Sequence, residues 1–280
     1  MTEHLFYPDS SALINAFPEV KIERKLGEGG QKYVYKAKTE QEGTVAFKII
    51  KTNQQLERTI REINAASSFC PPRFPKIYRY GHSNVGDIEV VFIVEEFIEG
   101  ISLRERINQG AVPEQEALKI GFELLLALCE ISNKNLVHRD IKPENIMLRN
   151  SGEVVLLDFG IARHLELNSL THDLAMFGPL TPGYAAPEQI NNEKRSISPR
   201  ADLFAWGIVM YEMISGSNPF TQSCSTGNEA LIRTLNFTPG RLESCSSELS
   251  KVIDWCMKKP VHRRPPSPAF VLEYMQRGLL

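Results

Sequence analysis

The segment HRDIKPEN at residues 138–145 restricts what this chain can fold into more than any other feature. It matches the pattern H-R-D-x-K-x-x-N, whose five fixed positions occur by chance in a chain of this length on the order of once in ten thousand sequences. A long helical pattern precedes the segment and a strand-like apolar run follows it, so we expect a loop between a helix and a strand. The alternative is a polar surface loop with accidental spacing.

The residue types in and after this segment fit the transfer of a charged group to a hydroxyl. Asp140 can accept the proton of an attacking hydroxyl, and Lys142 can neutralise charge on a moving phosphoryl group. Asn145 can hold a metal ion through its side-chain oxygen. Asp158 begins an Asp-Phe-Gly triplet directly after the apolar run at 154–157. Its carboxylate would supply a second oxygen ligand of the kind that Mg²⁺ prefers.

Together these motifs resemble the eukaryotic-like (Hanks-type) serine/threonine protein kinase family over about residues 20–275. The triplet that ends at Glu188 matches the A-P-E element of that family. Asp202, ahead of a Trp-Gly pair, resembles the start of the helix that supports the catalytic loop. Arg263 resembles the late arginine that pairs with the A-P-E glutamate, so we expect a Glu188–Arg263 ion pair. The stretch TPGYAAPEQI at 181–190 is similar to bacterial members in particular.

Strand and helix signals divide the chain into two parts. The first part has short strand-like runs broken by glycine, at 21–26, 33–38, 45–50 and 88–98. It has one helical pattern, at 54–69. The second part has apolar residues at helical spacing, at 113–135, 201–215, 248–258 and 268–277. A strand-rich part followed by a helix-rich part predicts an α+β fold with two lobes.

The resemblance implies the bilobal protein kinase fold, with a small β-rich lobe, a larger helical lobe and ATP bound in the cleft between them. We expect a catalytic domain at 21–280 after an N-terminal extension at 1–20, whose role is left open. The expected divisions of the domain are an N-lobe at about 21–97, a hinge at about 96–101 and a C-lobe at about 101–280.

The resemblance also implies a nucleotide site in the small lobe. The run VAFK, which ends at Lys48, resembles V-A-I-K, so that Lys48 would contact the α- and β-phosphates of ATP. Its partner would be Glu62, 14 residues further along, and both would support catalysis by Asp140 and Lys142. The expected nucleotide contacts also include Gly27, Glu28, Gly29, Gly30, Val34, Ala46, Glu96 and Ile98. Mg²⁺ would be held by Asn145 and Asp158.

Two positions depart from the family pattern. Lys32 stands where the third glycine of the glycine-rich loop is expected, and it could either strain the loop or bring a cation to the phosphates. Glu95 falls at the position behind the adenine, which is usually apolar. A buried carboxylate there would need a partner, for which Lys48 is nearest, unless the alignment is wrong by one residue.

These departures keep an alternative open, in which the chain is a pseudokinase or scaffold that binds nucleotide with weak or no transfer. Degraded domains usually lose one of four residues that this chain keeps: Lys48, Asp140, Asn145 and Asp158. A small-molecule kinase is a further alternative, but such enzymes generally lack H-R-D-x-K, D-F-G and A-P-E together.

Thr181 lies where serine/threonine kinases carry a threonine that bonds the catalytic aspartate and lysine. Together with Lys142, this favours serine and threonine hydroxyls of protein substrates as acceptors, with autophosphorylation as a further possibility. Arg139 resembles the arginine that receives a phosphate on the activation loop, and Ser169 and Thr171 are the local acceptors. Whether either is phosphorylated is left open.

Composition excludes several other classes of protein. A formal net charge of −2 argues against wholesale binding to nucleic acid or to an anionic membrane. Five scattered cysteines without a C-x-x-C pair indicate buried free thiols in a reducing compartment. We expect neither a signal peptide nor a membrane span, and hence a cytoplasmic protein. The oligomeric state and the identity of the substrate are left open.

Overall fold

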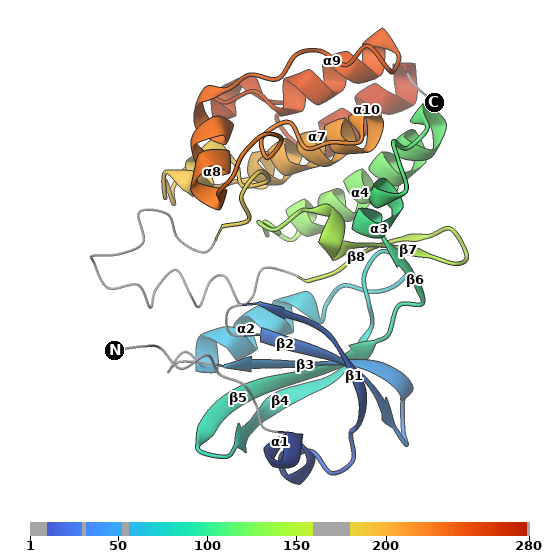
Figure 1. Ribbon diagram of the computed structural model, residues 1–280, viewed down its shortest axis with the longest axis vertical. Helices are drawn as coiled ribbons and strands as arrows, with labels where there is room; N and C mark the ends of the chain where they lie inside the picture. Colours follow the sequence, from blue (N-terminus) through green and yellow to red (C-terminus); the bar gives the residue numbers. More distant parts are fainter. Residues whose placement is uncertain (1–9, 30–31, 52–55, 159–179, 279–280) are drawn as a thin grey trace. The chain divides into compact units, whose positions relative to one another are not determined.

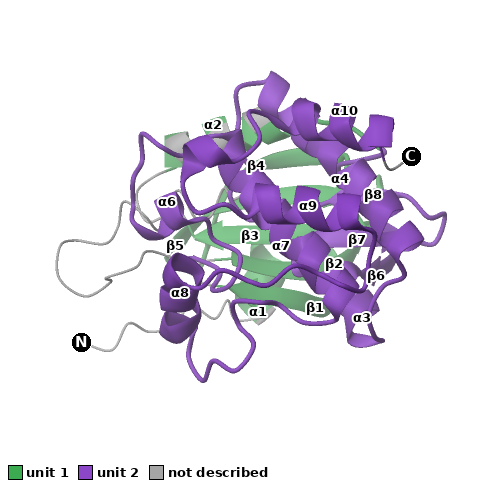
Figure 2. Cartoon of the chain, turned by 90° about the horizontal axis from the view of Figure 1, so that it is seen from above, with its two compact units in different colours: residues 1–71, 75–98, 161–171 green, residues 72–74, 99–160, 172–280 purple. Residues whose placement is uncertain are grey.

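The computed structural model describes residues 10–29, 32–51, 56–158 and 180–278 (Figure 1). The side chains at 58, 62 and 65 are also outside this description. The chain forms two compact units (Figure 2). Unit 1 comprises residues 1–71, 75–98 and 161–171, and unit 2 comprises residues 72–74, 99–160 and 172–280. The domain and hinge bounds given above stay predictions.

Unit 1 is built on one antiparallel sheet of five strands in the order β1-β2-β3-β5-β4. The strands are β1 Lys21–Gly29, β2 Lys32–Thr39, β3 Gly43–Lys51, β4 Ile77–Val85 and β5 Ile88–Glu96, and the helices are α1 Ser10–Ala16 and α2 Leu56–Ala66. Strands β3 and β5 are buried over most of their length, whereas β1 is largely exposed. This pattern is that of central strands and an edge strand.

Residues 10–20 pack into the core of unit 1. Phe17, just after α1, meets the ring of Phe47 edge-on at 5.0 Å between centroids and that of Phe92 at 5.1 Å. Leu13 and Val20 are buried in the same cluster. Large aromatic side chains contribute much of the apolar area of a core, so this part of the N-terminal extension is a structural part of unit 1.

Unit 2 is mainly helical and carries a small antiparallel sheet in the order β6-β7-β8. The strands are β6 Gly100–Ser102, β7 Ile146–Arg149 and β8 Val154–Leu156. The helices are α3 Leu103–Asn108, α4 Glu114–Asn133, η1 Pro143–Asn145, α6 Pro187–Ile190, α7 Pro199–Ser215, α8 Gly227–Asn236, α9 Ser247–Cys256, η2 Val261–Arg263 and α10 Pro268–Gly278. These two units confirm the predicted α+β fold with a strand-rich first part.

Helix α7 is a core helix of unit 2, because 13 of its 17 residues are buried. Two glycines let neighbouring helices approach it closely. A Cβ on Gly121 of α4 would collide with Met210, and a Cβ on Gly207 would lie 2.9 Å from Cγ of Met257. Trp206 Nε1 donates a hydrogen bond to the Gly121 carbonyl oxygen at 2.9 Å, which fixes α4 against α7.

All five cysteines are free thiols, as predicted. Only Cys256 is buried, whereas Cys129, Cys224 and Cys245 are half-buried and Cys70 is exposed, so the prediction of buried thiols is confirmed for Cys256 and wrong for Cys70. Within the part of the chain that the structure describes, no helix has the length and apolar character needed to cross a bilayer.

Candidate active site

Four polar side chains that the sequence singled out meet at Asp140: three come from the loop between α4 and β7, and the fourth, Thr181, comes from the segment before α6. Asp140 Oδ1 accepts a hydrogen bond from Thr181 Oγ1 at 3.0 Å, and Asp140 Oδ2 accepts one from Asn145 Nδ2 at 3.0 Å. Lys142 Nζ lies 3.2 Å from Asp140 Oδ2 and 3.3 Å from Thr181 Oγ1. The predicted bonding of Thr181 to the loop aspartate and lysine is therefore present. Figure 1 labels α4 and β7, which precede and follow this loop, and β8, which precedes Asp158.

Asn145 is oriented so that it can also serve a metal ion. Its amide nitrogen donates both to the carbonyl oxygen of Asp140, at 2.9 Å, and to the Asp140 carboxylate. The amide oxygen takes no part in these two bonds. Asp158 follows β8 with a left-handed backbone, φ 54°, and the neighbouring Leu157 N–H donates to the Asn145 carbonyl oxygen at 2.8 Å. This hydrogen bond therefore links the backbone at Asn145 to the residue directly before Asp158.

One amide oxygen and one carboxylate fit Mg²⁺, which commonly takes one or two protein ligands and completes its shell with water and substrate phosphates. Within the described ranges, no group of three or more carboxylate, imidazole or thiolate side chains gathers into a metal site. Phe159 and Gly160, the rest of the D-F-G triplet, lie outside the described residues.

Asp202, near the start of α7, fixes the backbone of the loop by hydrogen bonds. Its two carboxylate oxygens accept the backbone N–H groups of His138 and Arg139, each at 2.8 Å. Arg139 has a left-handed backbone, φ 68°, a conformation that costs energy for a residue with a side chain. Burial raises the pKa of Asp202 to about 6, against the opposing effect of these two amide donors. The predicted support of the loop by the Asp202 helix is confirmed.

The predicted partner of Glu188 was wrong by one residue. Glu188 forms a two-pronged ion pair with Arg264, in which Nη1 and Nη2 each lie 2.8 Å from a carboxylate oxygen. Both residues are buried, whereas Arg263 is exposed. The short helix η2 explains the shift, because it turns the side chain of Arg263 outward and leaves the next residue to face Glu188.

Lys259 is held next to this ion pair in a mainly apolar environment. Its ammonium lies 4.0 Å from the ring centroid of Phe220 and 5.3 Å from that of Phe204, and it donates to the carbonyl oxygen of Thr234. Burial and the nearby charge of Arg264 lower the pKa of Lys259 to about 7.

The pKa of Lys259 leads to a prediction about stability and pH. Between about pH 7 and the ordinary lysine value of about 10.4, the unfolded chain binds a proton that the folded chain lacks, so stability rises with pH. We expect the free energy of unfolding of wild type, relative to Lys259→Met, to increase by about 1 kcal/mol or more between about pH 7 and 9.5. Urea denaturation across this range measures it. Lys258→Met controls for the change in net charge, and a difference that stays flat with pH would contradict the prediction.

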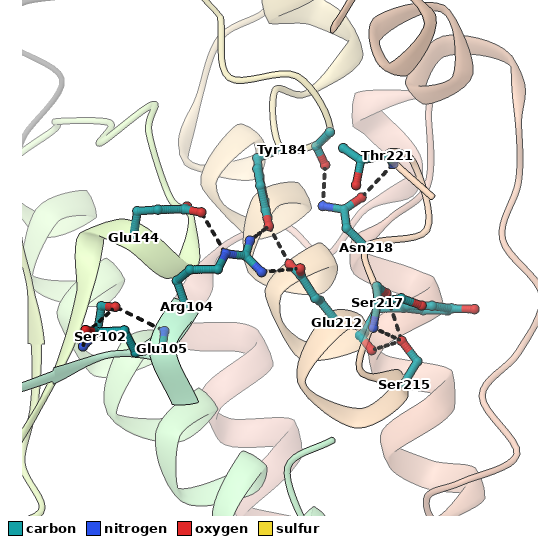
Figure 3. A network of polar contacts seen from close by, with 12 residues as sticks. Ser102, Arg104, Glu105, Glu144, Tyr184, Glu212, Ser215, Ser217, Asn218 and Thr221 are labelled. Carbon is teal, nitrogen blue, oxygen red and sulfur yellow. Dashed lines mark hydrogen bonds and ion pairs between the residues drawn. The ribbon is translucent and has the colours of Figure 1, made fainter. Parts of the chain in front are cut away.

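A second polar network in unit 2 has no counterpart among the sequence predictions (Figure 3). Arg104 donates to Glu144 at 2.7 Å, to Glu212 at 2.6 Å and to the Tyr184 hydroxyl at 2.5 Å. Tyr184 in turn donates to Glu212. Burial opposes the charge on Arg104, but its bonds to these carboxylates raise its pKa above the ordinary value.

This network fixes the segment after Thr181 to α3, to η1 and to α7. Asn218 adds a bond from Nδ2 to the carbonyl oxygen of Gly183 at 3.2 Å. Gly183 has φ 85°, and a Cβ there would collide with Thr221, so glycine is required. Because the partners of Arg104 lie 40, 80 and 108 residues away, no local pattern in the sequence could have found them.

In unit 1, strand register places the predicted nucleotide contacts on one face of the sheet. Lys48 on β3 pairs with Val34 on β2, and Val34 pairs with Gly27 on β1. Ala46 lies two residues from Lys48 and therefore on the same face. Phe47 points to the opposite face, into the aromatic core.

The other predicted contacts are divided between this sheet and residues outside the description. Glu28 is exposed and bonds Lys25 at 2.6 Å, Glu96 ends β5, and Ile98 is buried just after it. Gly30 and the side chain of Glu62 lie outside the described residues, as do Ser169 and Thr171. The predicted Lys48–Glu62 pair therefore stays a prediction.

Lys32 fits the strand without a glycine. It pairs with Gly29 across the β1–β2 hairpin, and its φ is not positive. A lysine there loses nothing that only glycine provides. The strain considered from the sequence is therefore absent at Lys32.

Comparison with known proteins identifies the family. The profile of the protein kinase domain matches residues 20–275. The probable serine/threonine-protein kinase pknA2 of Bifidobacterium longum is 36% identical over 210 residues, which cover 71% of this chain and 27% of that protein. The serine/threonine-protein kinase PrkC of Bacillus subtilis is 33% identical over 207 residues, covering 71% and 31%.

A third relative, the serine/threonine-protein kinase PknL of Mycobacterium tuberculosis, is 31% identical over 254 residues, which cover 88% of this chain and 59% of that protein. The chain spans about a third or less of the length of several curated relatives that it matches. These relatives are bacterial, in agreement with the resemblance seen at 181–190. From the match over residues 20–275 and the loop geometry that accompanies it, the chain belongs to the protein kinase domain family.

Proposed function

We propose that this protein transfers the γ-phosphoryl group of ATP to serine and threonine hydroxyls of protein substrates, with autophosphorylation as one outcome. The observation that carries the proposal is the cluster around Asp140, in which Lys142, Asn145 and Thr181 each lie within hydrogen-bond distance of the Asp140 carboxylate. Support also comes from the names of the relatives, which are serine/threonine-protein kinases.

In this proposal Asp140 and Lys142 act directly on the reacting groups. Asp140 accepts the proton of the attacking hydroxyl, because its carboxylate is fixed on both sides by hydrogen bonds from Thr181 and Asn145. Lys142, next to that carboxylate, neutralises charge that develops on the moving phosphoryl group. Asp202 keeps the loop backbone in place while this happens.

ATP and Mg²⁺ are the implied substrate and cofactor. Asn145 and Asp158 would hold Mg²⁺, which when bound neutralises charge on the phosphate oxygens. Lys48 would contact the α- and β-phosphates, with the glycine-bearing β1–β2 hairpin approaching them through backbone N–H groups. Glu96 and Ile98 would contact the nucleotide from the end of β5.

The pseudokinase alternative has no observation in its favour, since Lys48, Asp140, Asn145 and Asp158 are all retained, and Asp140 and Asn145 are joined by hydrogen bonds. We propose protein substrates and a cytoplasmic location, the latter from the free cysteines alone.

Mapping of phosphorylated residues tests the proposal. Purified protein is incubated with labelled ATP and Mg²⁺, alone and with a general protein substrate, and the products are mapped by mass spectrometry. We expect phosphoserine and phosphothreonine, with Ser169, Thr171 and residues 1–20 as the sites in this chain. Phosphotyrosine as the main product would contradict the acceptor assignment, and no transfer to any acceptor would overturn the proposal.

Replacing Thr181 tests whether its hydroxyl contributes to the rate of phosphoryl transfer. Thr181→Val keeps the shape of the side chain but removes the hydroxyl that bonds Asp140 and Lys142, and a misplaced catalytic group can cost about a hundredfold in rate. We expect kcat to fall by about that factor, with the KM for ATP little changed. Thr181→Ser restores the hydroxyl and should restore most of the rate. Equal rates for the valine and serine variants would contradict this role.

A further inference from the structure

Glu95 and Lys48 form a buried ion pair inside the sheet of unit 1. In the β3–β5 register, Lys48 lies opposite Ile93 and Ala46 lies opposite Glu95. Lys48 and Glu95 are therefore diagonal neighbours on one face, a spacing that long side chains can bridge. The ammonium of Lys48 contacts Oε1 of Glu95. The choice left open by the sequence, between a partnered carboxylate and a shifted alignment, is settled in favour of the partner.

Both charges of this pair are almost fully removed from water. The Lys48 side chain is 7% exposed and that of Glu95 is 6% exposed. A charge this deeply buried requires a partner, and the contact between the two side chains supplies one of opposite sign to each. Burying an acidic side chain at this point of a central strand is therefore energetically costly unless it is paired. Its partner here is Lys48, the lysine that the proposed function uses.

We infer that Glu95 is a positioning residue for Lys48, which holds the ammonium in place for contact with the nucleotide phosphates. The inference rests on the proposed function, since it assigns a partner to a lysine of that same site. It does not depend on what other groups Lys48 contacts.

The rigidity of the frame supports this role. Lys48 and Glu95 lie on adjacent strands joined by a continuous backbone register from Val45 to Lys51, so their separation is fixed by the sheet. Helix α2 packs on the same face, where Asn64 accepts a hydrogen bond from Tyr80, a residue opposite Ile93. A carboxylate borne by a strand holds the lysine independently of the position of that helix.

The chemistry of the ammonium favours positioning over competition with the nucleotide. An ammonium group carries three donors, so one can remain on Glu95 while others meet phosphate oxygens. A competing carboxylate would have to be released when ATP binds, and its removal would then strengthen ATP binding. The two roles predict opposite results for a neutral residue at position 95.

The test uses Glu95→Gln, which keeps the shape and removes the charge, in wild type and in Lys48→Met. Glu89→Gln is the matched control, because it removes the same charge from an exposed position on the same strand. For each variant kcat and the KM for ATP are measured, together with unfolding in urea followed by far-UV circular dichroism.

We expect Glu95→Gln to lower kcat by about tenfold or more, with a change in the KM for ATP of less than about threefold. In the Lys48→Met background it should cause no further loss. Glu89→Gln should behave as wild type. Wild-type kcat in Glu95→Gln, a rise in ATP affinity and rate, or an undiminished loss without Lys48 would each overturn the inference.

Unfolding separates this inference from the proposed function. If wild type transfers no phosphate, the proposed function fails, but the pairing is still decided by the double-mutant cycle. Glu95→Gln should destabilise wild type by more than it destabilises Lys48→Met, because only in wild type does it remove a charge that pairs with the Lys48 ammonium. Additive effects in the two backgrounds would overturn the inference whatever the activity.

Discussion

Asp140→Ala should reduce phosphoryl transfer by about a thousandfold or more while leaving ATP affinity nearly unchanged. A positioned general base contributes roughly 10²–10⁴-fold, and Asp140 also anchors Thr181, Asn145 and Lys142, which would lose their common partner. The nucleotide contacts proposed for Lys48 and the β1–β2 hairpin do not involve it. Single-turnover transfer and nucleotide titration, measured separately, give the two quantities.

Asp158→Ala is the comparison that distinguishes loss of the general base from loss of a metal ligand. Its carboxylate is proposed to hold Mg²⁺, so its loss should weaken binding of Mg²⁺-ATP as well as slow transfer. Glu273→Ala, on the exposed face of α10, removes an acidic side chain far from either task and should leave both unchanged. Wild-type transfer by both the Asp140 and the Asp158 variants would overturn the kinase assignment.

The loop site could be predicted because its residues are close together in the sequence. Asp140, Lys142 and Asn145 lie within six residues, and the turn of η1 brings Asn145 back to the Asp140 carboxylate. Asp202 was found through its resemblance to a supporting helix, and the two amides that it binds explain why such a residue is needed there.

Contacts set by tertiary packing were harder to predict. The Arg104 network joins α3, η1, the Tyr184 segment and α7, and nothing in the spacing of its charges marks them as partners. Residues 10–20 carry apolar side chains too few to show a clear period, so their docking through Phe17 depends on a core formed by other strands. The ion pair of Glu95 was foreseen only because a carboxylate in a central strand demands a partner.

The error at Arg263 has the same origin. Two adjacent arginines offer the same charge to Glu188, and which of them faces inward depends on the turn of η2 and on the backbone around it. Sequence alone gives the chemistry of that pair but not its register. The structure assigns the inward position to Arg264, with consequences for stability that differ sharply between the two neighbours.

Arg264→Met should destabilise unit 2 by about 3–5 kcal/mol, the cost of breaking a buried ion pair by removing one partner. The guanidinium donates to both oxygens of Glu188 and also to three backbone carbonyl oxygens, those of Lys258, Lys259 and Arg200, at 2.7–2.9 Å. All of these acceptors would lose their donor at once.

Both tryptophans, Trp206 and Trp255, lie in unit 2, so urea unfolding followed by tryptophan fluorescence reports this change directly. Arg264→Lys should rescue little, because one ammonium cannot replace a planar fork that serves five acceptors. Arg263→Met is the matched control: its side chain is exposed, and a surface substitution of this kind changes stability by about 0.5 kcal/mol or less. Equal losses of unfolding free energy at positions 263 and 264 would show that the buried pair with Glu188 does not stabilise unit 2. A loss confined to position 263 would reassign the pair to Arg263, the residue first expected from the sequence.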